Sequence, residues 1–231
     1  MIPLRDTVPS ARLPIINLTL IALNALGFLY ELSLGDSLHQ FIQVFGLVPA
    51  RFHSGSAAAI TSLFSSMFLH GSWLHLLGNM LFLYIFGDNV EDRLGHLRYL
   101  CFYLLCGAAA GVAQAYAIAS STFPMIGASG AIAGVTGAYF LFFPRARVVT
   151  LVPIFFFFQI IEIPAVVFLF LWFLMQLMYG MATMSAAGQA VGGVAWWAHI
   201  GGFIFGMVAA PLLAPSKRTR AVRVQGLSWR D

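Results

Sequence analysis

Six apolar stretches, separated by short segments that hold most of the charged residues, constrain the fold of this chain more than any other feature. Only 9% of the residues are charged, whereas a soluble domain needs about 25% to cover its surface. The folded chain must therefore contact lipid. A membrane-spanning helix needs about 20 apolar residues, and we predict six, at residues 14–34, 68–87, 97–119, 129–143, 163–179 and 194–213.

The basic residues predict the orientation of these helices. With the N-terminus in the cytosol, every Lys and Arg except Arg51 lies on the cytosolic side, as the positive-inside rule requires. We therefore predict an all-α membrane protein with both termini in the cytosol, divided into an N-terminal tail (1–12), a membrane domain (13–214) and a basic C-terminal tail (215–231). The net charge of +4 fits this topology better than nucleic-acid binding. The short tails lack the composition of a transit peptide, which suggests a bacterial cytoplasmic membrane.

Three connecting segments have distinct compositions. Residues 35–66 form a long first outer loop that mixes apolar and small residues, so we expect a folded element lying partly in the membrane interface. Residues 151–158 resemble an interfacial hairpin, and residues 182–193 predict a small, flexible external loop.

Polar residues inside membrane spans are energetically costly and indicate function by default. His75 and Asn79 are four apart, on one face of the second span. Ser129 begins the short fourth span, and His199 lies in a glycine-rich part of the sixth. At about 1.5 Å per residue, Ser129 and His199 each lie about 21 Å above the cytosolic ends of their helices. His75 and Asn79 fall close to the same depth, so the four side chains are predicted to meet in one layer.

These residue types suit hydrolysis. A serine becomes a good nucleophile when a neighbouring base removes its proton, and His199 matches its depth best. The oxyanion formed by the attack could be bound by Asn79, His75 and the backbone N–H of Ser129 at a helix N-terminus. We also predict close helix packing, because Gly130 with Gly134 and Gly202 with Gly206 form two GxxxG motifs.

Each feature alone has a simpler interpretation. Ser129 in GxSG fits a small packing residue, His75 with Asn79 fits an interhelical hydrogen bond, and His199 fits a buried core histidine. His70 fits interfacial structure, although it could border the cavity. The combination of all these features favours a catalytic site.

The combination resembles the rhomboid family of intramembrane serine proteases. The resemblance covers most of the chain and rests on HGSWLHLLGNMLFLYIFGDNVEDRLG, GASGAIAGVTGAYF and AHIGGFIFG, in that order. It implies a six-helix bundle that cleaves single-span membrane proteins near the outer ends of their helices, without metal or cofactor. By the same resemblance Ser129 and His199 form the catalytic dyad, and His75, Asn79 and the Ser129 backbone form the oxyanion site. We also predict residues that support the site, namely His70, Gly127, Gly130, Gly202 and Gly206.

The chain departs from the family pattern at two places. Many members carry a Trp-Arg pair in the first outer loop, where this chain has Ile60-Thr61-Ser62. Some members stack an aromatic residue on the histidine one turn after the serine, where this chain has Ala133. The orientation of His199 must then come from elsewhere, with Tyr139 or the preceding tryptophans as candidates.

Two other classes of function stay open. One is an inactive relative that binds membrane proteins without cutting them, although such relatives usually lack the serine or the histidine. The other is a small transporter or channel, which usually has broken helices or ionisable groups along a path. Here Glu31 and Glu162 are the carboxylates near spans and outside the charged loops. The sequence does not indicate the oligomeric state.

Overall fold

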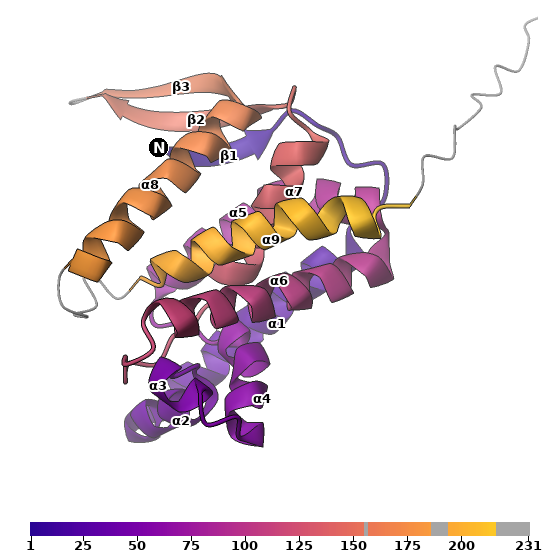
Figure 1. Ribbon diagram of the computed structural model, residues 1–231. Coiled ribbons are helices and arrows are strands. Elements are labelled where there is room, and N and C mark those ends of the chain that lie inside the picture. The colour runs from indigo at the N-terminus through magenta and orange to yellow at the C-terminus, as the bar shows by residue number, and fades with distance from the viewer. Residues whose placement is uncertain (155–156, 186–193, 216–231) are drawn as a thin grey trace, which may run out of the picture.

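The computed structural model describes residues 1–154, 157–185 and 194–215, and shows a mostly helical chain with one small sheet (Figure 1). In chain order the elements are β1 (Ile2–Asp6), α1 (Ile15–Ser33), η1 (Gly35–Ser37), α2 (Leu38–Phe45), α3 (Pro49–Phe52), α4 (Ala57–Ser65), η2 (Ser66–Phe68), α5 (Trp73–Leu94), α6 (His96–Ala117), α7 (Ser129–Phe142), β2 (Arg147–Ile154), β3 (Phe157–Pro164), α8 (Ala165–Ser185) and α9 (Trp196–Leu213).

Among the described residues, four helices are long and apolar enough to cross a membrane, namely α1, α6, α8 and α9. They make the chain a multi-pass membrane protein. Helix α7 is apolar but has only 14 residues, and α5 has charged residues in its last two turns. The predicted number of six spans therefore stays a prediction, as do the cytosolic positions of the termini.

Helix α5 differs most from its predicted range of 68–87. It begins later because residues 66–68 form a 3₁₀ turn, and the Ser72 side chain then accepts the backbone N–H of His75 as a helix cap. It ends later because its charged last turns have partners. The buried carboxylate of Glu91 accepts the backbone N–H groups of Ile16 and Asn17, at the start of α1. The charges that were expected in a loop therefore join two helices.

The small sheet corrects the prediction of an all-α protein. Its strand order is β1-β2-β3, and both pairs are antiparallel. The predicted hairpin is present in extended form, since β2 and β3 pair from Arg147↔Pro164 onward. Strand β1 lies in the predicted N-terminal tail and pairs with β2, so this tail packs on the helical domain. Helix α8 consequently begins at Ala165, after β3, and not at residue 163.

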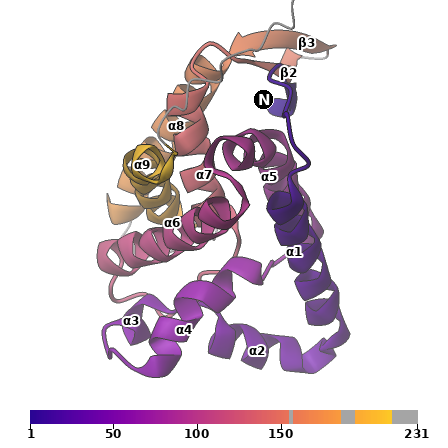
Figure 2. The same cartoon turned by 90° about the vertical axis from the view of Figure 1, so that its right-hand side faces the viewer.

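The segment between α1 and α5 is folded, as expected for the first outer loop, and it lies at the opposite end of the bundle from the sheet (Figures 1 and 2). It is anchored to the chain before α7 without a Trp-Arg pair. Leu47 and Met125 exchange two backbone hydrogen bonds of 3.0 and 2.7 Å, and the N–H of Ala50 donates to the Ser121 carbonyl. The residues Ile60-Thr61-Ser62 lie within α4.

Helix α7 occupies the centre of the bundle, where it packs against α5, α6 and α9 (Figure 2). Every residue from Gly130 to Tyr139 is buried. Small side chains allow this burial, because they let the neighbouring helices approach closely on several sides. Residues 186–193 of the predicted external loop and residues 216–231 of the predicted basic tail lie outside the described residues.

Candidate active site

Ser129 is the first residue of α7 and follows a turn at Gly127. Gly127 has φ 122°, a conformation that side chains rarely allow, and its N–H donates to the Ser66 carbonyl at 2.8 Å. The first helical hydrogen bond of α7 runs from the Ile132 N–H to the Ala128 carbonyl. The N–H groups of Ser129 and the next two residues therefore precede the helical ladder and are available to an anion.

His199 lies in the first turn of α9 and is buried, with 8% of its surface exposed. The backbone of this turn is fixed by α6, because the Gln114 side chain accepts the N–H of Ala198 at 3.0 Å. The turn of the helix that carries the imidazole thus has a defined position relative to α6.

The glycines of α7 and α9 pack backbone against backbone. A Cβ atom added to Gly202 would lie 2.1 Å from the Gly130 carbonyl oxygen, and one added to Gly206 would lie 2.1 Å from that of Gly134. No real Cβ atom tolerates such a distance, so the two GxxxG motifs allow a separation that larger residues would prevent. At this separation the Ser129 Oγ lies 2.8 Å from the His199 Nε2, which is a hydrogen bond.

His75 and Asn79 of α5 approach the same turn from the other side. A Cβ added to Gly127 would lie 2.7 Å from the His75 Nε2 and 3.6 Å from the Asn79 Nδ2. Gly127 therefore provides room for both side chains beside Ser129. The Asn79 amide is fixed by a 3.0 Å hydrogen bond between its Nδ2 and the Nε2 of His70.

His70 is itself buried and held in place. It is 2% exposed, and its backbone N–H donates to the Glu31 carboxylate of α1 at 3.0 Å. The predicted supporting residue therefore contacts Asn79 and not the Ser129 hydroxyl. Glu31, which the sequence placed near a span end, links α1 to this part of the site.

Two residues that the sequence analysis did not select hold His199. The Nδ1 of His199 lies 2.7 Å from the Gln176 Oε1 of α8, and the Trp172 ring lies 5.8 Å away at a tilt of 34°. Trp196 makes an edge contact at 6.2 Å, in agreement with the suggestion that a preceding tryptophan orients the histidine. Tyr139, the other suggestion, is wrong because its hydroxyl donates to Asp6 near the sheet. Gln176 could have been found as a polar residue within an apolar span.

Comparison with known proteins identifies the family of the chain. The family model of the Rhomboid domain matches residues 57–216, which is most of the chain and includes Ser129, His199, His75 and Asn79. The chain belongs to the rhomboid family.

Three relatives from Arabidopsis thaliana are also rhomboid-like. The chain is 33% identical to RHOMBOID-like protein 5 over 76 residues, 36% identical to RHOMBOID-like protein 6, mitochondrial, over 76 residues, and 36% identical to Rhomboid-like protein 11, chloroplastic, over 70 residues. The matched stretches cover 33%, 33% and 30% of this chain and 25%, 24% and 25% of the relatives. The chain thus spans about a quarter of the length of these curated relatives. Two of them carry an organelle in their names, so they do not support the bacterial membrane that we expected.

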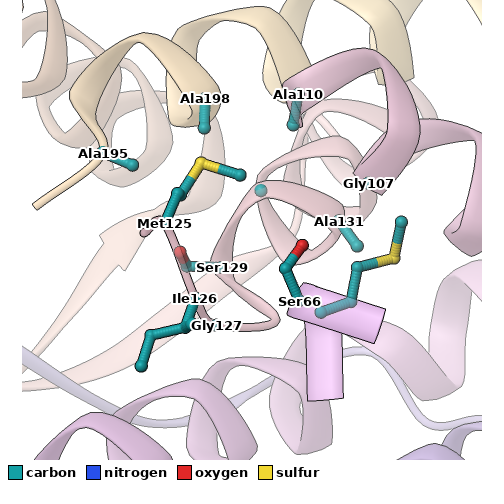
Figure 3. A pocket seen from close by; sticks show the side chains of 12 residues that line it. Ser66, Gly107, Ala110, Met125, Ile126, Gly127, Ser129, Ala131, Ala195 and Ala198 are labelled. Carbon is teal, nitrogen blue, oxygen red and sulfur yellow. The ribbon is translucent and has the colours of Figure 1, made fainter. Parts of the chain in front are cut away.

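The rhomboid domain has a small pocket beside Ser129 (Figure 3). Most of its lining side chains are small, and Ser66 and Ser129 are its hydroxyl-bearing residues. Ala110 of α6 and Ala198 of α9 face it from the neighbouring helices (Figure 3). A pocket of this kind has room for about one water molecule next to the serine hydroxyl. No group of three metal-ligating side chains occurs within the described part of the chain.

Proposed function

We propose that this rhomboid protein is an intramembrane serine endopeptidase, with Ser129 as nucleophile and His199 as its general base. The observation that carries this proposal is the 2.8 Å contact between the Ser129 Oγ and the His199 Nε2. A serine and a base within hydrogen-bonding distance, with a third group orienting the base, form the usual arrangement of nucleophilic catalysis. Membership of the rhomboid family supports the same reaction.

The proposed reaction has two halves. The Ser129 Oγ attacks the scissile carbonyl carbon while its proton passes to the His199 Nε2, and the peptide nitrogen leaves with that proton to give an acyl-enzyme. Water then attacks the acyl carbon and its proton passes to the His199 Nε2. The Ser129 Oγ takes up that proton as its bond to the acyl carbon breaks, which releases the carboxylic acid product and restores the dyad. In both halves the negative oxygen is bound by the Ser129 N–H and the amide of Asn79, with His75 beside them.

The proposed substrates are membrane proteins that reach the site within the bilayer. The pocket beside Ser129 supports a small residue next to the cleaved bond, because its walls include Gly107, Ala110 and Ala131. We propose that cleavage occurs near the outer ends of the substrate helices, with both termini of this protein in the cytosol. The position of the basic residues supports that orientation.

The test is cleavage of a single-span reporter by the purified protein in proteoliposomes, with alanine at the cleaved position. We expect Ser129→Ala and His199→Ala each to lower kcat by about 10⁴-fold or more, because either change removes the proton transfer. Ser33→Ala serves as the control, since the hydroxyl of this exposed serine, the last residue of α1, donates to the Tyr30 carbonyl of its own helix. A fluorophosphonate probe should label the wild type and Ser33→Ala but not Ser129→Ala.

Two outcomes would reject the proposal. Equal cleavage by the wild type and Ser129→Ala would exclude the nucleophile. A wild-type protein that binds the reporter and neither cleaves it nor reacts with the probe would indicate the client-binding alternative.

A further inference from the structure

We infer that Gln176 is a positioning residue, which fixes the tautomer of His199 so that its unprotonated nitrogen faces Ser129. This inference rests on the proposed function and extends it by one residue. It also accounts for the orientation of His199 in a chain that has Ala133 where relatives stack an aromatic residue.

The orientation of the Gln176 amide is set by the backbone. The Nε2 of Gln176 lies 3.1 Å from the carbonyl oxygen of Trp172, one turn earlier on α8. A carbonyl oxygen only accepts hydrogen bonds, so the amide nitrogen must be the atom that faces it. The amide oxygen of Gln176 consequently faces His199.

The same reasoning extends to the imidazole. The Gln176 Oε1 can only accept, and the His199 Nδ1 lies 2.7 Å away, so the Nδ1 must carry the hydrogen. In a neutral imidazole the other nitrogen is then an acceptor. That nitrogen is the Nε2, which accepts the hydroxyl hydrogen of Ser129 at 2.8 Å. The three hydrogen bonds thus form a chain in which each group donates to the next. Ser129 donates to His199, His199 donates to Gln176, and Gln176 donates to the Trp172 carbonyl.

Burial makes this arrangement specific. Gln176 is 5% exposed, so water does not replace its amide as a partner for the Nδ1. The Trp172 and Trp196 rings contact the imidazole at 5.8 and 6.2 Å and restrict its rotation. Gln176 and Trp172 are four residues apart and lie on one face of α8. A neutral amide orients the imidazole without placing a charge in the membrane, where a carboxylate would be costly.

The experiment compares Gln176→Met, which keeps the length but removes the acceptor, with Gln176→Glu, which keeps an acceptor and adds a charge. We expect Gln176→Met to lower kcat by about 10- to 10³-fold with KM unchanged, because the wrong tautomer becomes populated. Gln176→Glu should retain more activity than Gln176→Met. As the pH is lowered, the kcat/KM of Gln176→Glu should begin to fall at a higher pH than that of the wild type. The reason is that a carboxylate beside Nδ1–H favours the imidazolium form of His199, which cannot act as a base.

Gln114→Met is the matched control, because it removes another buried glutamine that contacts the backbone of α9 and not the imidazole. We expect it to lower thermal stability without moving the pH profile. The inference would be overturned if Gln176→Met had the same kcat as the wild type, or if Gln176→Glu had the same pH profile as the wild type. If Gln176→Met does not fold, the pH profile of Gln176→Glu is the deciding measurement.

Failure of this inference is distinguishable from failure of the proposed function. If Ser129→Ala abolishes cleavage while Gln176→Met equals the wild type, only the role of Gln176 is rejected. If Ser129→Ala cleaves as well as the wild type, the protease itself is rejected, whatever Gln176 does.

Discussion

The two ends of α7 are held in different ways. At the Ser129 end, Gly130 and Gly134 contact Gly202 and Gly206 of α9 through backbone atoms. The backbone contact with α9 continues to Gly137, and beyond it, at the sheet end, side chains make the contacts. The Tyr139 hydroxyl donates to the Asp6 carboxylate at 2.5 Å, and its ring packs edge-on against Phe86 at 5.0 Å.

This difference separates the groups that hold the helix from those available for chemistry. Backbone contacts use no functional group, so the side chains of Ser129, His199 and Asn79 can face a common space. At the sheet end the Tyr139 hydroxyl and the Asp6 carboxylate are occupied with each other, and Asn89 donates to the same carboxylate at 3.3 Å. Substitutions at the Ser129 end should therefore alter activity or block helix packing. Polar substitutions at the sheet end should alter stability alone.

The largest effect is expected from Gly202→Ala. The added Cβ would lie 2.1 Å from the Gly130 carbonyl oxygen, so α7 and α9 must separate. We expect a loss of about 3 kcal/mol or more in the free energy of unfolding, together with loss of cleavage. Thermal unfolding in detergent micelles measures the first effect.

Gly78→Ala is the matched control for that substitution. A Cβ at this position of α5 meets no atom within 4 Å, so the same change should be neutral or stabilise the helix by up to about 1 kcal/mol. Equal stability of the Gly202→Ala and wild-type proteins would show that α7 and α9 do not depend on backbone contact.

Asn79→Ala should have the next largest effect and should act on the reaction. Removing one donor from an oxyanion site lowers kcat by about 10²-fold or more, equivalent to about 2.7 kcal/mol. Asn79 also bonds His70, so the unfolding temperature should be measured with the steady-state kinetics. An unchanged kcat would remove Asn79 from the oxyanion site while leaving Ser129 and His199 in place.

Asp6→Asn should have the smallest effect, one that depends on pH. Burial raises the pKa of Asp6 above its ordinary value of 3.8, and the charge of nearby Asp88 raises it further, while the hydrogen bond from Tyr139 opposes the shift. A raised pKa in the folded state means that the neutral form is favoured there. Stability is then greatest below about pH 4 and falls as the pH rises through the raised pKa.

In Asp6→Asn the amide can still accept from Tyr139 but does not ionise. We therefore expect the variant to lack this fall, so that its unfolding free energy rises relative to that of the wild type as the pH increases from 4 to neutrality. Parallel wild-type and variant profiles over this range would contradict the assignment, and cleavage activity should be unchanged in either case.

The sequence predicted the helical parts of the fold well where apolar residues run without interruption. The predicted ranges 14–34 and 97–119 agree closely with α1 and α6. The predictions from sequence were wrong where a segment takes its structure from a partner far away in the chain. The strand β1 forms because β2 pairs with it, and the charged end of α5 stays helical because Glu91 binds the start of α1. Neither partner can be inferred from local composition.

The candidate site was predictable in its residue types, because buried polar groups are rare in membrane spans. The structure brings Ser129 and His199 into contact and places His75 and Asn79 beside Gly127. Gln176 was missed because one glutamine among apolar residues indicates no partner by itself. Its role depends on the rotation of α8 about its axis, which periodicity does not define in a helix that is apolar on all sides.

The pairing of β1 with β2 also orders the assembly of the chain. Ile2 faces Leu151, so β1 is synthesised long before its partner strand exists. Joining such distant segments closes a very large loop, which makes the sheet a late step. Until then β1 presents unpaired backbone groups that another chain could bind.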